Sequence, residues 1–335
     1  MTRPLPAGLD AQARAWVRAT YGDTMSAAAL EVLPGHAGLT YALDVADPSG
    51  TVVDRLVLRL PPLGVRRHGS TDVLRQAPLL RTLSAAGVPV ADVREASDDE
   101  RWFDVPYLVV ARMPGRTVSI DQGGEPPRQE HFHASVAALA ALHCVPWQTT
   151  LSGWSDPRSY ADEVHAWDRA LHKVAGSSWH ADAESVRVSL LQAAPQKART
   201  GVNHGDYQFS NLLFVDEQLT AVLDWEIAGI GPQLLDLGWF LVINDQRSWA
   251  HAVVVEGRPS DAELLDTYQD ALGIPVDRGE LAYSCALSAY RFAVIAGLNL
   301  SLHRSGRRVD EHWETLEPSI PVLLARAWQD LASAG

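Results

Sequence analysis

Hydrophobic periodicity changes along this chain at about residue 127, and this change constrains the fold more than any other feature. Before it, residues 40–45 and 52–60 have the alternating or continuous apolar pattern of strands, and turn formers separate them at residues 47–50. The pattern predicts a β-hairpin. Residues 71–86 have helical spacing and end at a glycine, and a new strand is expected over residues 88–90.

Helical spacing dominates the rest of the chain, and residues 201–224 interrupt it with short strands. At 335 residues the chain exceeds the size at which one hydrophobic core usually stops growing, so we expect two lobes. The sequence therefore predicts an α+β chain with a small N-terminal sheet plus one helix and a larger, mainly helical C-terminal part. The predicted helices of that part cover residues 131–144, 157–174, 181–194, 233–244, 261–271, 278–303 and 311–332.

A group of oxygen-bearing side chains lies where the helical pattern is interrupted. Asp206 and Asn211 are five residues apart, and Asp224 follows the apolar residues 221–223. Phosphoryl transfer needs a carboxylate beside the acceptor hydroxyl and hard oxygen donors for Mg²⁺. A single Asp before a strand is usually a cap or turn residue. The three residues together, at this spacing, match the catalytic and metal loops of kinases and predict a phosphotransferase site.

The segment from His204 to Asn211, with the downstream Asp224, resembles the aminoglycoside phosphotransferase family. This family is a branch of the protein-kinase-like superfamily that phosphorylates small molecules, and the resemblance covers nearly the whole chain. It implies that Asp206 is the catalytic aspartate and that His204 supports its loop. It also implies that Asn211 and Asp224 bind Mg²⁺ and that ATP is the phosphoryl donor.

The same resemblance implies a bilobal protein-kinase-like fold. Residues 1–113 would form the nucleotide-binding lobe, and residues 114–335 the catalytic and substrate-binding lobe. Asp236 would buttress the catalytic loop, although the residues alone also allow a helix-start role. Glu226 is open to two interpretations, contact with the metal or contact with solvent.

Two glycines and an arginine mark the expected phosphate end of the nucleotide site. Gly35 and Gly38 precede the strand expected at residue 40, where glycine lets backbone N–H groups approach phosphates. Two glycines alone are equally typical of a hairpin, but the position resembles the family's nucleotide-covering loop. Arg59 stands where the family has its phosphate-binding Lys or Arg, and a guanidinium can hold phosphate as a two-pronged donor. The alternative is a surface arginine on a strand.

The helix that follows departs from the family pattern at Gln76, where a glutamate usually pairs with the phosphate-binding cation. The amide can accept a hydrogen bond from Arg59 but supplies no charge, and Asp72 is a candidate to supply it. Pro78 favours a kink if it lies inside this helix. The departure leaves open an alternative function, a catalytically weak or inactive nucleotide-binding pseudokinase.

The strand expected at residues 107–111 runs into a Pro-Gly turn and resembles the last strand and hinge of the family's N-terminal lobe. By that resemblance adenine would pair with the backbone near Ala111 and Met113. An ordinary buried strand that ends in a turn is the alternative.

Net charge and cysteine content restrict which binding partners and which cellular location we expect. The formal net charge of −13 argues against a nucleic-acid partner, which needs clustered Lys and Arg. The sequence has no apolar run of about 18 residues, and residues 1–10 lack the features of a secretory signal. We therefore expect a cytoplasmic protein without a membrane partner. Cys144 and Cys285 are too few for a disulfide framework or a cysteine zinc site and are expected to be packed thiols.

The acceptor is the least constrained part of the prediction. Relatives by resemblance phosphorylate aminoglycosides, macrolides, choline, homoserine or hydroxyacyl-CoA compounds, so antibiotic resistance is one option among several. The acid excess favours a cationic acceptor, whereas Arg304, Arg307 and Arg308 favour an anionic one. The sequence predicts a small-molecule hydroxyl acceptor and a monomer or homodimer.

Overall fold

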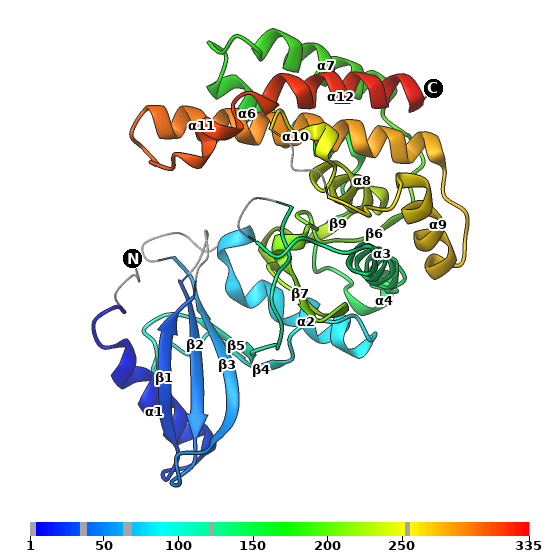
Figure 1. Ribbon diagram of the computed structural model, residues 1–335. Coiled ribbons are helices and arrows are strands. Elements are labelled where there is room, and N and C mark those ends of the chain that lie inside the picture. The colour runs from blue at the N-terminus through cyan, green and yellow to red at the C-terminus, as the bar shows by residue number, and fades with distance from the viewer. Residues whose placement is uncertain (1–4, 34–38, 63–68, 121–123, 252–254, 335) are drawn as a thin grey trace. The chain divides into compact units, whose positions relative to one another are not determined.

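The computed structural model describes residues 5–33, 39–62, 69–120, 124–251 and 255–334. The chain forms two compact units, each described by itself below (Figure 1). Unit 1 comprises Met1–Gly115 together with Thr220–Ile227, and unit 2 comprises Arg116–Leu219 and Ala228–Gly335. A short segment from the second half of the chain therefore belongs to the N-terminal unit.

Unit 1 is built on a five-stranded antiparallel sheet with the order β1-β2-β3-β5-β4. The predicted hairpin is confirmed as β2 and β3, and Gly50 takes a φ of 85° in the turn between them, a conformation that favours glycine. The elements are α1 (Leu9–Tyr21), β1 (Ser26–Val32), β2 (Leu39–Ala46), β3 (Val52–Leu60), α2 (Gln76–Ala85), β4 (Val93–Ser97) and β5 (Tyr107–Ala111).

One face of this sheet is closed by α1. Trp16 and Val17 of α1 pack in the same core as alternate strand residues, for example Tyr41 of β2 and Leu58 of β3. Because successive strand side chains point to opposite faces, Arg59 and its alternate neighbours point to the other face. Burial of the first face thus fixes which side of the sheet carries the predicted phosphate-binding arginine.

The start of α2 corrects two expectations. The helix begins at Gln76, after two 3₁₀ turns at Gly69–Thr71 and Val73–Arg75, and not at residue 71. Pro78 therefore lies in the first turn, where its missing N–H would have no intrahelical acceptor, so it breaks no helical hydrogen bond.

The end of α2 corrects a third expectation, the strand at residues 88–90. The N–H of Val88 donates to the carbonyl of Leu83 at 3.0 Å, and Gly87 takes a φ of 79°, a pattern typical of a helix C-cap. Val88 is buried as part of this cap, and the next strand, β4, begins at Val93. The sequence reasoning also missed α1 and β1.

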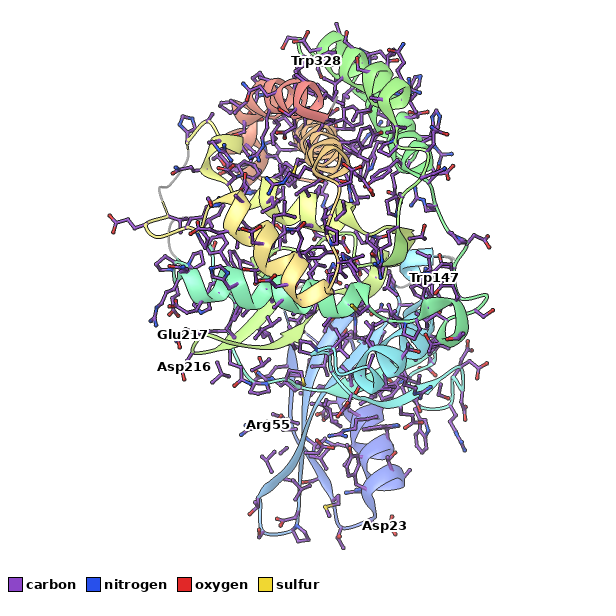
Figure 2. The ribbon with its side chains drawn as sticks, turned by 90° about the vertical axis from the view of Figure 1, so that its right-hand side faces the viewer. Asp23, Arg55, Trp147, Asp216, Glu217 and Trp328 are labelled. Atoms are coloured by element: carbon purple, nitrogen blue, oxygen red, sulfur yellow. The ribbon has the colours of Figure 1, made fainter. Side chains whose placement is uncertain are left out.

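Unit 2 is mainly helical, as predicted. Helix α10 is its central element and lies against α7, α8 and α12 (Figure 1). Side chains fill the space between these helices, while Trp328 of α12 is 43% exposed at the outer surface (Figure 2). The helices are α3 (Gln129–His143), α4 (Trp147–Thr150), α5 (Tyr160–His165), α6 (Asp168–Lys173), α7 (His180–Ala193), α8 (Leu234–Ile243), α9 (Asp261–Leu272), α10 (Arg278–Arg304), α11 (His312–Leu316) and α12 (Ser319–Ala334).

Two of the predicted helices are each split in two. Residues 157–174 form α5 and α6, and residues 311–332 form α11 and α12. Pro318 contributes to the second break, because a proline has no N–H to donate to a helical hydrogen bond. Among the described helices, α10 has the length and hydropathy of a membrane span, but 78% of its apolar window is buried inside the protein.

Short strands carry the predicted catalytic segment. Strand β6 (Thr200–Asn203) pairs with β9 (Gly229–Pro232), and β7 (Leu212–Val215) pairs with β8 (Gln218–Val222). The turn between β7 and β8 carries Asp216 and Glu217, which extend into solvent (Figure 2). The residues between β6 and β7 form a fixed loop, which includes the 3₁₀ turn Phe209–Asn211.

Candidate active site

The loop between β6 and β7 holds Asp206 through its own backbone and through His204. The N–H of Asp206 donates to Nδ1 of His204 at 3.1 Å, and the His204 side chain is fully buried. Gly205, between them, takes a φ of 86°, which a residue with a side chain rarely adopts. His204 is thus placed to support the loop and not to face an acceptor.

Three side chains orient the carboxylate of Asp206. Its Oδ1 accepts hydrogen bonds from Nε2 of Gln208 at 2.8 Å and from Nε1 of Trp239 at 3.1 Å. Its Oδ2 accepts one from Nδ2 of Asn211 at 3.0 Å, and the same nitrogen donates to the Asp206 carbonyl at 2.9 Å. Because both Asn211 bonds use the amide nitrogen, the amide oxygen, which can bind a metal ion, takes part in neither.

Asp236, at the start of α8, anchors the loop by binding two of its backbone amides. Its Oδ2 accepts from the His204 N–H at 2.6 Å, and its Oδ1 accepts from the Gly205 N–H at 2.9 Å. Burial would raise the pKa of this carboxyl, but His143, His204 and the Gly205 amide stabilise the anion, and the pKa is lowered. This geometry fits the buttressing role expected for Asp236.

Two residues that contact Asp206 or its loop, Trp239 and Arg291, were not predicted to do so from the sequence. Trp239 lies three residues after Asp236, so both side chains are on the same face of α8, and this spacing was a usable signal. Arg291 donates from Nη2 to the Gly205 carbonyl at 2.6 Å and is 7% exposed. Its signal was a lone charge within the apolar stretch of a long helix, where charged residues are rarely buried without a reason.

In unit 1, Arg59 contacts three acceptors. Its Nη1 donates to Oε1 of Gln76 at 2.9 Å, and Gln76 is 2% exposed. Its Nη2 lies 3.4 Å from Oδ1 of Asp224 and 3.6 Å from Oε2 of Glu226. Gln76 therefore orients the guanidinium, and the opposite charge comes from the segment after β8. Asp72, the candidate for this charge, instead caps a 3₁₀ turn through the N–H of Leu74.

Asp224 has an unusual backbone. Its φ is 63°, in the left-handed region, and its side chain is 46% exposed. Such strain persists when the surroundings enforce it, and it is common at binding sites. The exposed carboxylate is available to a ligand of unit 1.

The sheet face that carries Arg59 also presents a polar cavity. Its volume is about 420 Å³, and Arg55 and Met113 help to line it. The N–H of Ala111 donates to the Asp92 carbonyl at 2.8 Å, so this N–H is not available to a base. The cavity lining comprises Asp44, Arg55, Arg112, Met113, Pro114 and Gly115, and the predicted residues Gly35 and Gly38 lie outside the described residues.

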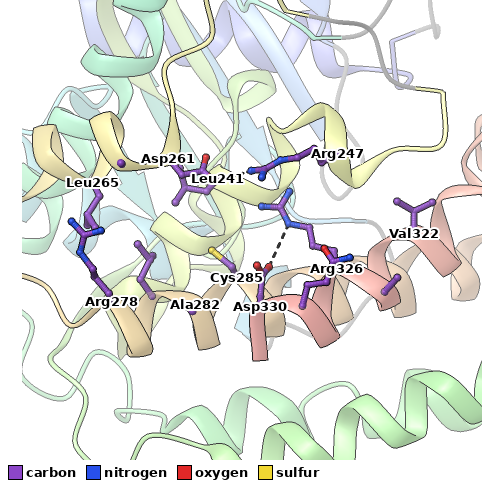
Figure 3. A pocket seen from close by; sticks show the side chains of 14 residues that line it. Leu241, Arg247, Asp261, Leu265, Arg278, Ala282, Cys285, Val322, Arg326 and Asp330 are labelled. Carbon is purple, nitrogen blue, oxygen red and sulfur yellow. Dashed lines mark hydrogen bonds and ion pairs between the residues drawn. The ribbon is translucent and has the colours of Figure 1, made fainter. Parts of the chain in front are cut away.

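A separate cavity of about 460 Å³ lies in unit 2, and none of the predicted site residues lines it (Figure 3). Leu241 lines it from α8, about half a helical turn away from the face with Asp236 and Trp239. Cys285 is also part of the lining, and burial raises the pKa of its thiol far above the usual value. Cys285 is therefore a packed thiol as expected, whereas Cys144 is exposed.

The oxygen donors suited to a divalent cation are distributed over both units. Asn211 belongs to unit 2, and Asp224 and Glu226 belong to unit 1. Within the described parts of the chain, no group of three His, Cys, Asp or Glu side chains forms a metal site. The donors offered are carboxylate and amide oxygens, which are ligands of hard cations.

The chain is similar in sequence and in fold to several known proteins. Acyl-CoA dehydrogenase family member 10 of Mus musculus is 28% identical over 253 residues, which cover 72% of this chain and 22% of that protein. The chain thus spans about a fifth of that curated relative. An assigned aminoglycoside phosphotransferase of Ralstonia eutropha superposes with a TM-score of 0.75 at 20% identity, covering 95% and 98% of the two chains. Amicoumacin kinase in complex with AMP-PNP and Ca²⁺ superposes with a TM-score of 0.58 at 15% identity, covering 89% and 88%.

These superpositions confirm the predicted α+β, protein-kinase-like fold. The sequence model of the phosphotransferase enzyme family matches residues 30–283, which are most of the chain and include every residue of the loop around Asp206. The family resemblance of the sequence is likewise confirmed, and the chain belongs to the phosphotransferase enzyme family.

Proposed function

We propose that this phosphotransferase transfers the γ-phosphoryl group of ATP to a hydroxyl group of a small molecule. The observation that carries the proposal is the carboxylate of Asp206, which three donors orient within a loop anchored on buried Asp236. A carboxylate held in this way can orient an acceptor hydroxyl and accept its proton.

In the proposed reaction, the acceptor oxygen forms a bond to the γ-phosphorus as its proton passes to Asp206. The bond from this phosphorus to the β,γ-bridging oxygen breaks, and that oxygen leaves with ADP. Trp239 and Gln208 keep Oδ1 of Asp206 hydrogen bonded, and Asn211 does the same for Oδ2. The side chain therefore does not have to reorganise during the transfer.

Magnesium fits the oxygen donors that the chain offers. Asn211 would hold it through its amide oxygen and Asp224 through its half-exposed carboxylate. When bound, the metal ion neutralises charge on the β- and γ-phosphates. Arg59, oriented by Gln76, would bind the phosphates through its guanidinium.

The nucleobase would lie on the Arg59 face of the sheet in unit 1. Because the N–H of Ala111 is already bonded, we assign the base contact to the backbone of Met113, beside the polar cavity. Gly35 and Gly38 remain our candidates for covering the phosphates. The structure of amicoumacin kinase with AMP-PNP supports a nucleotide as ligand of this fold.

For the acceptor, we propose a hydroxyacyl-CoA thioester as the first class to test. The relative named acyl-CoA dehydrogenase family member 10 shares 28% identity with this chain over part of its length, which favours acyl-CoA chemistry. Aminoglycosides, macrolides, choline and homoserine are the other acceptors. A cytoplasmic location would supply both ATP and such metabolites.

One observation favours a second function, a nucleotide-binding protein without transfer activity. Gln76 replaces the glutamate that usually neutralises the phosphate-binding cation. Against it, Asp224 and Glu226 both lie within 4 Å of Arg59 and supply the negative charge that Gln76 lacks. We therefore favour the active transferase.

The test is ADP release by the purified chain with Mg-ATP and each acceptor class in turn. Acceptor-dependent ADP release with mass-spectrometric detection of the phosphorylated acceptor would support the proposal and name the acceptor. Thermal stabilisation by Mg-ATP without phosphorylation of any acceptor would support the nucleotide-binding alternative. Saturation at about 100 times the dissociation constant should stabilise by roughly 2.7 kcal/mol.

A further inference from the structure

Arg291 is a buried cation that forms no ion pair within 4 Å among the described residues, although the carboxylates of Glu163, Asp206 and Asp236 favour its charged form. Its side chain lies between two indoles, 4.5 Å from the ring centroid of Trp239 and 5.2 Å from that of Trp167. Its buried Nε has no hydrogen-bond partner among the described residues, and burial lowers the pKa of the group. A hydrophobic residue of the same length would avoid the cost of burying this charge. Packing at this position therefore does not by itself require a charge.

The contacts of Arg291 lead to Asp206 by two routes. The first is the backbone, because Nη2 donates to the carbonyl of Gly205, the residue that precedes Asp206. The N–H of Gly205 is held at the same time by Asp236. Both polar groups of Gly205, which has a φ of 86°, are thus fixed from different elements.

The second route is the indole of Trp239. Arg291 lies over its ring, and the indole N–H donates to Oδ1 of Asp206 at 3.1 Å. Phe292 contacts the same ring at a centroid distance of 5.8 Å. Side chains from α10 therefore set the orientation of the ring that aims the carboxylate.

We propose that Arg291 is a positioning residue for Asp206, acting through the Gly205 carbonyl and the Trp239 indole. The inference rests on the proposed function in one respect, that Asp206 accepts the proton of the acceptor hydroxyl. Misplacing a reacting group by about 1 Å can reduce a rate by roughly 10²-fold. Loss of Arg291 should therefore reduce turnover much more than nucleotide binding or stability.

The experiment compares Arg291→Met and Arg291→Lys with Arg326→Met. Arg326 is a matched control because it is also buried in unit 2, but its partners are Asp245, Ser248 and Asp330, far in sequence from the Asp206 loop. Arg291→Met should lower kcat by at least about tenfold while the KM for ATP stays within about threefold. Arg291→Lys, which keeps the charge but not the planar fork, should recover part of kcat.

A second readout does not depend on activity. Hydrogen exchange of the amides in residues 203–207 should be faster in Arg291→Met and unchanged in Arg326→Met. If the wild-type chain transfers no phosphate, the proposed function fails, and exchange alone then decides whether Arg291 fixes the loop. Unchanged exchange, a kcat within about twofold of wild type, or a loss of kcat that only follows the fraction unfolded would each overturn the role.

Discussion

Arg59 of β3 donates a 2.9 Å hydrogen bond to Oε1 of Gln76, at the first turn of α2. This bond to a neutral amide occupies the place of an expected ion pair, and the negative charge comes from Asp224 and Glu226. The usual glutamate both orients the phosphate-binding cation and neutralises its charge. Here Gln76 orients Arg59, and other residues of unit 1 neutralise it.

This division predicts the behaviour of Gln76 variants. Gln76→Ala removes the orienting acceptor and should raise the KM for ATP by about three- to tenfold, which corresponds to the net contribution of one hydrogen bond. Gln76→Glu keeps an acceptor at the same place and should stay within about threefold of wild type. Nucleotide titration of both variants, with melting curves to confirm folding, is the measurement. An unchanged KM in Gln76→Ala would show that Gln76 does not orient Arg59.

Asp206→Asn tests the proposed proton acceptor. The amide keeps the size of the side chain but cannot take up the proton, so turnover should fall by about 10²- to 10⁴-fold while nucleotide affinity stays within several-fold. Asp216→Asn is the control, because Asp216 lies in the β7–β8 turn of the same unit with a φ of 52° that asparagine tolerates. Retained turnover in Asp206→Asn would remove this residue from the chemistry.

A substitution at Asp224 should change ligand binding but hardly change the stability of the free protein. Asp224→Gly relieves a left-handed backbone, a gain of up to about 1 kcal/mol, and loses a partly exposed ion pair worth at most about 1 kcal/mol. The melting temperature should therefore change little, whereas stabilisation by Mg-ATP should disappear. Asp216→Gly has the same backbone change without a ligand role and should respond to Mg-ATP like wild type. Equal responses in both variants would mean that Asp224 holds no metal.

The sequence indicated which side chains of the Asp206 loop lie together, but not which side chains of other elements contact them. The spacing of Asp206 and Asn211 indicates one short loop, and the loop indeed brings their side chains to 3.0 Å. The bonds from Trp239 and Arg291 depend on where α8 and α10 pack, and side-chain packing of distant segments is not encoded in local spacing. For the same reason, the negative charge beside Arg59 was expected on Asp72, one helical turn before Gln76. It lies instead on Asp224, which is 165 residues from Arg59 in the sequence.

Each error in the predicted elements has an identifiable physical cause. Val88 is apolar and follows a glycine, so it reads as the start of a strand, but its N–H completes the C-cap of α2. Strand β1 was missed because three alanines and a glutamate dilute its apolar alternation, and its pairing with β2 determines its structure. Pairing and capping were decisive where the periodic pattern was weak.

The loop around Asp206 should also give the protein a specific acid sensitivity through Asp236. The pKa of Asp236 is lowered below the ordinary value of 3.8 for an aspartate, so the unfolded chain takes up a proton at a higher pH than the folded chain does. The resulting stabilisation is complete above that value and is lost as the pH falls through the folded pKa.

Asp236→Asn lacks this component and loses charge-assisted bonds to the His204 and Gly205 amides, worth about 1.5–3 kcal/mol each. Urea unfolding from pH 7 down to pH 3 should therefore show a less stable variant at pH 7 whose curve approaches wild type in acid. Parallel curves at every pH would contradict the assignment, and Asp216→Asn should follow wild type throughout.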